Sequence, residues 1–270
     1  MLIDFHTHAF PDSIAPKTVA VLKKAMADHS GLDIEPFTDG TVGSLEKSAV
    51  HYGVDISVVL PIATKESQTE KINTFAKNIS SPHTVSFASL YPYQADRIDV
   101  LKTIAEAGFA GIKLHPEYQE FFVDCAESIE IINEAEKLGL YVVLHTGEDG
   151  GYPPPYHCLP DRLAHALEYF SGKNVIAAHM GGFRAWDDVE KYLAGTEIYM
   201  DTAMITDFMP KAQCERIIKK HGADKILFGT DMPWDNPSDT LEYLTSLDLS
   251  SDELDKIKYK NAMKILNIKA

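Results

Sequence analysis

The feature of this sequence that most constrains its fold is a repeated alternation of short apolar runs and amphipathic stretches. Apolar, branched runs fall near residues 2–6, 55–62, 84–90, 109–115, 140–145, 174–179, 198–201 and 226–231. The stretches between them show helical spacing of apolar residues at 66–78, 96–107, 125–138, 160–170, 187–193 and 210–221. Because strands buried on both faces and joined by helical crossovers pair side by side, the pattern predicts a parallel sheet.

Eight such strands favour a closed (β/α)8 barrel, a TIM barrel, over an open doubly wound sheet. An open sheet usually has fewer strands and a glycine-rich nucleotide loop after the first one, where this chain has His6-Thr7-His8. Barrels of this kind commonly contain about 250 residues. We therefore expect residues 1–270 to form one barrel domain, with a final amphipathic helix at 251–266 that has Ser251 near its N-cap.

Two connections that follow strands are long enough to shape a substrate site. Residues 9–44 contain a predicted helix at 16–27, and residues 146–159 are rich in glycine and proline. Long loops over the active face of a barrel often act as walls or lids. We expect these two connections to determine the shape of the substrate.

Five of the apolar runs end in residues that commonly bind metals. On a strand, residues two apart face the same way, so His6 and His8 can direct two imidazoles to one place. The other four runs end at His115, His145, His179 and Asp231. Because the C-terminal ends of barrel strands meet at one face, which holds the active site, these endings predict a single shared site.

The types of ligand suit a catalytic divalent metal ion. Zinc binds neutral imidazole nitrogen and carboxylate oxygen, and catalytic sites leave one position open. Zinc is the expected metal, although manganese, iron or cobalt would also suit these ligands, with one or two ions in each chain. The predicted ligands from the ends of these runs are His6, His8, His145 and Asp231. Such a metal lowers the pKa of bound water and polarises a carbonyl.

Asp231 and His179 are the predicted catalytic residues. Asp231 would contact the metal and also accept the proton of the attacking water. His179 would either bind a second metal or donate a hydrogen bond to the developing oxyanion. Gly229, two residues before Asp231, has no side chain and would relieve crowding beside the site.

Lys113 and His115 are candidates for substrate binding or metal bridging. They lie two apart on one predicted strand, so both side chains should face the barrel interior. A neutral Lys113 amine can form a carbamate that bridges two metals, whereas a charged one can hold a substrate carboxylate. The sequence leaves both roles open. Asp201, at the end of the seventh run, fits a turn-capping role as well as a functional one.

The chain resembles the amidohydrolase superfamily, and within it the amidohydrolase-related branch of metal-dependent hydrolases and non-oxidative decarboxylases. The matching segments are 4–8, 111–116, 144–147, 178–182, 199–202, 228–233 and the closing 261–266. The resemblance implies a metal bound by His6, His8, His145 and Asp231. It also implies that His179 is a second-metal ligand or a catalytic histidine. Lys113 stands where binuclear members carry a carbamylated lysine.

Metal-dependent hydrolysis is the leading functional hypothesis. In it, a metal-activated water cleaves a C–N or C–O bond of a small amide, cyclic amide, ester or lactone. The alternative is a metal-dependent non-oxidative decarboxylase of aromatic or unsaturated acids, in which Lys113 and Arg184 anchor the carboxylate. A nuclease is less favoured, because such relatives usually carry a bridging glutamate where Lys113 stands. A non-enzymatic barrel is disfavoured, because structural zinc sites are normally closed by four protein ligands.

Composition narrows the partners and the compartment. The net charge of −15 repels polyanions, so we expect a small-molecule substrate and no nucleic-acid partner. No apolar stretch reaches the roughly 18 residues that span a bilayer, so no membrane association is expected. Three widely separated cysteines suit a reducing cytoplasm. A homo-oligomer is compatible with the sequence.

Overall fold

Short parallel strands form the centre of the fold in the computed structural model, which describes residues 1–268. Within this range the strands are β1 (Ile3–Thr7), β2 (Ile56–Val59), β3 (Thr84–Ser86), β4 (Ala88–Ser89), β5 (Gly111–Leu114), β6 (Tyr141–Leu144), β7 (Val175–Ala177), β8 (Tyr199–Asp201) and β9 (Ile226–Leu227). Neighbours pair in parallel in the orders β1-β2-β3 and β4-β5-β6-β7-β8-β9. β3 and β4 are two halves of one predicted strand, interrupted at Phe87, whose N–H donates to the Val59 carbonyl at 2.9 Å. Residues 269–270 of the predicted domain lie outside the described residues.

Hydrogen bonds between the chain around β9 and β1 close the barrel. The Phe5 N–H donates to the Phe228 carbonyl at 2.8 Å, and the Asp231 N–H donates to the His6 carbonyl at 2.8 Å. The buried Asp4 carboxylate accepts bonds from the Thr230 N–H at 3.0 Å and the Thr230 hydroxyl at 2.6 Å. These contacts join the first and last strands, and the predicted (β/α)8 barrel is confirmed.

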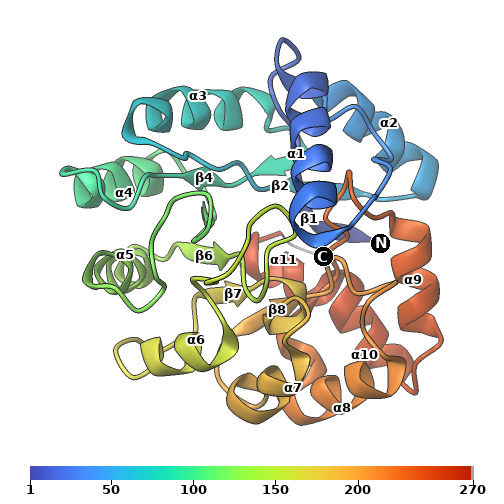
Figure 1. The fold of residues 1–270 in the computed structure, drawn as a ribbon. Helices are drawn as coiled ribbons and strands as arrows, with labels where there is room; N and C mark the ends of the chain where they lie inside the picture. Colours follow the sequence, from blue (N-terminus) through green and yellow to red (C-terminus); the bar gives the residue numbers. More distant parts are fainter. Residues whose placement is uncertain (269–270) are drawn as a thin grey trace.

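Helices surround the strands, as Figure 1 shows. They are α1 (Ala15–Ser30), α2 (Val42–Tyr52), α3 (Thr69–Ile79), α4 (Arg97–Glu106), α5 (Ala126–Lys137), α6 (Pro160–Ala166), α7 (Trp186–Asp188), α8 (Lys211–His221), α9 (Pro237–Thr245), α10 (Ser251–Asp255) and α11 (Asn261–Ile265). Within residues 1–268, no helix combines the length and apolar character needed to cross a membrane.

The helices differ from the prediction in a few places. α2 and α9 were not predicted, and both begin at capping residues: the Thr41 side chain accepts from the Ser44 N–H, and the Asn236 side chain accepts from two N–H groups. The predicted final helix is interrupted by a π-helical turn at Lys256–Lys260. Its N-cap is Ser250 rather than Ser251, because Ser250 forms a capping box with Glu253.

Two apolar layers hold the barrel together. Inside it, the fully buried residues that pack together include Phe5, Val58, Phe87, Val143 and Ile176. Between strands and helices, a second layer contains alternate strand residues such as Ile112 and Leu114. Lys113 lies between these two outward-facing residues, so its side chain points into the barrel, as predicted.

Candidate metal centre

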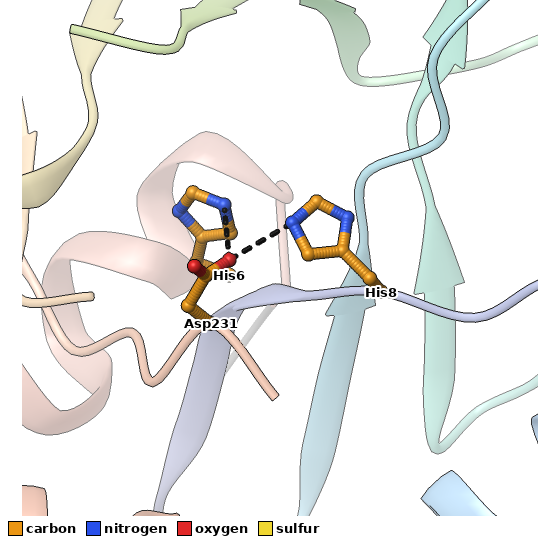
Figure 2. A group of neighbouring side chains, drawn as sticks. All are labelled: His6, His8 and Asp231. Atoms are coloured by element: carbon orange, nitrogen blue, oxygen red, sulfur yellow. Dashed lines mark ion pairs between the residues drawn. The ribbon is translucent and has the colours of Figure 1, made fainter. Parts of the chain in front are cut away.

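β1 directs two imidazoles onto one carboxylate at the C-terminal end of the barrel. The Nε2 atoms of His6 and His8 lie 3.2 Å and 2.9 Å from the same oxygen, Oδ1 of Asp231 (Figure 2). Asp231 reaches this position because the chain after β9 runs beside β1. The three residues form a group whose ligand atoms lie close enough together to hold one metal ion.

The other ring nitrogens of these histidines fix which atom carries the proton. His6 Nδ1 lies 2.9 Å from Oδ2 of Asp201, and His8 Nδ1 lies 3.1 Å from the Leu60 carbonyl oxygen. Both partners only accept, so in the neutral rings Nδ1 carries the hydrogen and donates it. The two Nε2 lone pairs then face the Asp231 oxygen, an arrangement that a shared cation stabilises.

His145 and His179 face each other in the same way. His179 Nδ1 lies 3.1 Å from the Ala203 carbonyl oxygen, and His145 Nε2 lies 3.1 Å from the Glu148 carbonyl oxygen. The remaining nitrogens, His179 Nε2 and His145 Nδ1, are 3.1 Å apart, and when both rings are neutral each presents a lone pair to the other. The His179 ring centre is 5.2 Å from that of His6, so the four imidazoles converge on one region. This donor set fits a divalent metal.

A second cluster contains His115, His145 and Asp149, which also lie close enough to hold an ion. The His115 ring stacks on His145 with centres 4.2 Å apart. His115 Nδ1 accepts from the Tyr118 N–H, so its Nε2–H can donate to Asp149 Oδ2 at 3.3 Å. His145 Nε2 lies 3.4 Å from the same oxygen. These donors and acceptors already match without a metal, so Asp149 is better explained as the carboxylate that orients both rings.

Asp201 contacts two of the candidate ligands, His6 and His179. Besides the His6 contact, its Oδ1 accepts bonds from the N–H groups of His179 at 3.0 Å and Ala203 at 3.1 Å. Burial would raise the pKa of this carboxyl, but its contacts with His6 and with the His179 N–H outweigh burial and lower the pKa to about 2. Asp201 is therefore ionised and orients His6. Asp201 thus combines the two roles that the sequence left open: it caps the following turn through the Ala203 N–H and it supports the site through His6.

Burial keeps three histidines of the site neutral, namely His6, His115 and His145. It lowers the pKa of His6 to about 4, against the opposing effect of Asp201. The pKa values of His115 and His145 also fall well below the ordinary value, mainly because of burial. Metal binding requires neutral imidazole, so these rings are in the protonation state that a ligand needs at neutral pH.

Lys113 projects a cation into the floor of the site. Its side chain is 1% exposed, and its Nζ has no hydrogen-bond partner within residues 1–268. Burial lowers the pKa of this amine to about 8, although Asp201, Asp231 and Asp149 oppose the shift. An amine of this pKa is mostly charged at neutral pH and has donors free for a ligand.

Two candidate residues occupy strained backbone. His179 and Asp231 have φ angles of +58° and +71°, in the left-handed region that non-glycine residues rarely adopt. Such strain persists where the surrounding structure enforces it, and it is concentrated at functional sites. Asp231 is held by the His6 carbonyl through its N–H, as described above.

The metal centre opens into a cavity of about 580 Å³. Both long connections contribute to its walls, the first through residues from Ala9 to Leu32 and the second through Asp149, Gly150 and Gly151. Arg184 differs from the expectation for a carboxylate anchor, because it is exposed, does not line this cavity and lies over the Phe183 and Phe208 rings.

The sequence predicted most residues of this site but not Asp149. All seven predicted residues line the cavity: His6, His8, Lys113, His115, His145, His179 and Asp231. His6, His8 and Asp231 form one group, and His145 joins them through His179 rather than directly. Asp149 lies four residues beyond His145 in the second long connection, and that spacing was its only signal.

Comparisons with known proteins identify the family and the fold. The profile of the amidohydrolase family matches residues 3–268. No curated protein matches the sequence. Among solved structures, an uncharacterised TIM-barrel protein from Bordetella bronchiseptica is 17% identical, with a TM-score of 0.74 over 99% of this chain and 98% of that chain.

Two further solved structures carry named activities. The probable 2-pyrone-4,6-dicarboxylic acid hydrolase from Acinetobacter baumannii is 14% identical, with a TM-score of 0.66, covering 98% of this chain and 99% of that chain. A dihydroxybenzoic acid decarboxylase from Polaromonas, with bound manganese and 2-nitroresorcinol, is 16% identical, with a TM-score of 0.65, covering 100% of this chain and 98% of that one. At these identities the similarity shows a shared fold.

Proposed function

The chain belongs to the amidohydrolase family, and from this we propose that it is a metal-dependent hydrolase. Its substrate is a small amide, cyclic amide, ester or lactone, in which it cleaves a C–N or C–O bond. The observation that carries the proposal is the convergence of the His6 and His8 lone pairs on the Asp231 carboxylate, beside the facing pair of His145 and His179. Hydrogen-bond acceptors on the far side of each ring support this arrangement.

The proposed ligands are His6, His8, His145, His179 and Asp231. A bound zinc or similar divalent ion would supply Lewis acidity, which polarises a carbonyl and acidifies water. The hydrogen bond that His179 Nδ1 makes to Ala203 supports a ligand role for its Nε2, because a neutral ring has no second hydrogen for an oxyanion.

Side chains of the protein accept the proton and bind the substrate. Burial raises the pKa of Asp231, but its contacts with His6 and His8 outweigh burial and lower it, so this carboxylate is ionised and can accept a proton from the attacking water. Lys113 Nζ holds an oxygen of the substrate, because its donors have no partner among residues 1–268. Asp149 and Asp201 keep the histidine rings in the required orientation.

A metal-dependent decarboxylase is the second candidate. A buried cation without a partner suits a carboxylate, which favours an acid as the ligand of Lys113. The Polaromonas decarboxylase, with its bound manganese, has the same fold. This activity would release carbon dioxide without net addition of water.

One experiment separates the two reactions. The metal-loaded protein is incubated in ¹⁸O-labelled water with lactones, esters and amides, and separately with hydroxybenzoates, and products are analysed by mass spectrometry. Incorporation of ¹⁸O that is lost in His8→Ala but kept in His29→Ala, an exposed histidine, supports hydrolysis. Carbon dioxide release from the benzoates without hydrolysis of the other substrates supports the lyase. Equal turnover by His8→Ala would refute both.

A further inference from the structure

The cavity above the metal centre is larger and more apolar than a reacting group requires. At about 580 Å³ it falls within the range of about 300–1,000 Å³ that accommodates drug-sized ligands. Its lining contains the histidines and Lys113, together with a larger number of apolar side chains and a few polar ones such as Thr18, Gln68 and Lys71. Because these walls are mostly hydrocarbon, the ligand must carry an apolar portion.

α1 forms one wall of this cavity with a regular row of side chains. Ile14, Thr18, Leu22 and Met26 all line the cavity, and they are spaced four residues apart. On a helix this spacing puts side chains on one face, one above the other. Figure 1 shows α1 nearer the middle of the molecule than α2 in this view, and because its row lines the cavity, this face of α1 is turned towards the cavity.

α3 and the chain before it provide further wall. Ile62, Ile72 and Phe75 line the cavity, together with Gln68 and Lys71. Positions 68, 71, 72 and 75 share one helical face by the same spacing rule. The space bounded by this face and the α1 row, here called the α1–α3 cleft, is therefore lined mainly by apolar groups.

Contacts at both ends keep α1 in place. The Ser30 hydroxyl lies 2.8 Å from the Gly150 carbonyl and donates to it, tying the end of α1 to the second long connection. Near the other end, a Cβ on Gly40 would come within 2.6 Å of Val19, so only glycine permits this close packing. The α1–α3 cleft is thus largely preformed, which lowers the entropic cost of binding.

We propose that the α1–α3 cleft binds the elongated apolar segment of an amphipathic substrate, whose carboxyl-derived group lies against Lys113 and the histidine cluster. The inference rests on the proposed function, because it takes that cluster as the reacting end. It identifies the substrate class as a carboxylic acid, or its ester, lactone or amide, that carries a hydrocarbon tail. Leu22 and Ile72 become specificity-determining residues.

Binding of a homologous series of n-alkanoates tests this inference without turnover. The metal-loaded protein is titrated with butanoate, hexanoate, octanoate and decanoate by isothermal titration calorimetry, below the concentrations at which they aggregate. Burial of each methylene should tighten binding about fourfold, so octanoate, with four more methylenes, should bind about 250-fold more tightly than butanoate. Constant affinity along the series, or no binding, would overturn the inference.

Variants locate the effect. Leu22→Gln should weaken octanoate binding about tenfold or more and leave butanoate unchanged, whereas Val21→Gln, on an exposed position of the same helix, should change neither. Ile72→Gln on the opposite wall provides a second test should Leu22→Gln fold poorly, and Thr74→Gln is its exposed control. Equal effects of the paired variants would refute the assignment.

The two proposals fail separately. If the protein hydrolyses short substrates in a metal-dependent reaction but binds alkanoates of all lengths equally, the cleft assignment is wrong and the proposed function stands. Chain-length-dependent binding that persists in a protein with no hydrolysis of any substrate would remove the proposed function and leave the cleft as a binding site.

Discussion

Replacing Asp201 with asparagine tests how the site controls the protonation of a ligand. In the wild type, Oδ2 accepts from His6 Nδ1 at 2.9 Å, and Oδ1 accepts from the His179 and Ala203 N–H groups. In Asp201→Asn the amide oxygen can keep the two backbone bonds, which leaves the NH₂ group facing His6 Nδ1. That nitrogen must then accept, so the hydrogen of the neutral ring moves to Nε2 and blocks the ligand atom.

The expected loss follows from the role of such carboxylates. Removal of a group that orients a ligand histidine typically lowers metal affinity about 10–100-fold, or about 1.4–2.8 kcal/mol. The assay is competition with a chromophoric chelator, with zinc and with manganese. Asp224→Asn, at an exposed aspartate, removes the same charge and should leave the affinity unchanged. Thermal unfolding without metal confirms that both variants fold. Unchanged affinity in a folded Asp201→Asn would refute the proposed control of His6.

Three further perturbations follow from the same geometry. Gly229→Ala would place a Cβ 2.9 Å from His6 Cβ. The free energy of unfolding, measured by urea titration, should therefore fall by about 1–3 kcal/mol. The control is Gly43→Ala, whose added Cβ meets nothing within 4 Å among the described residues and should not reduce it. In chelator-treated protein, NMR titration should give His6 a pKa near 4. Folding lowers this pKa, so the free energy of unfolding keeps its full value above about pH 6.5 and falls by about 3 kcal/mol as the pH is lowered towards 4. A His6 ring that titrates near 6.5 would contradict the burial argument. Lys113→Met should retain one bound metal and lose at least tenfold in kcat/KM; the loss of one of two bound ions would instead show that Lys113 bridges them.

The barrel could be predicted from the sequence because its strands are buried on both faces and therefore appear as continuous apolar runs. α2 and α9 escaped detection because their starts depend on the capping residues Thr41 and Asn236 rather than on a long apolar period. Phe87 interrupts a strand through a hydrogen bond to Val59, a neighbour far away in the sequence. Such local features depend on tertiary contacts.

The sequence predicted which strand ends carry the residues of the site, but not how these residues are arranged. Parity along β5 correctly directs Lys113 inward, because strand geometry repeats every two residues. On β1 the register shifts between Asp4 and Thr7, so His6 and the adjacent Phe5 both lie inward, which parity alone does not predict. Parity does not reveal that His179 stands between His145 and His6, since this depends on how neighbouring strands and the turn after β7 are arranged. Asp149 lies on a connection whose conformation is set by packing, and it had no periodic signal at all.

The metal content of the purified protein tests the central claim most directly. Protein prepared without chelator is analysed by elemental mass spectrometry, in parallel with His8→Ala and the exposed-site control His29→Ala. The account predicts a ratio of one or two divalent ions per chain that is preserved in the control and collapses in His8→Ala. A ratio near zero that added zinc or manganese does not restore, or a ratio unchanged in His8→Ala, would contradict it.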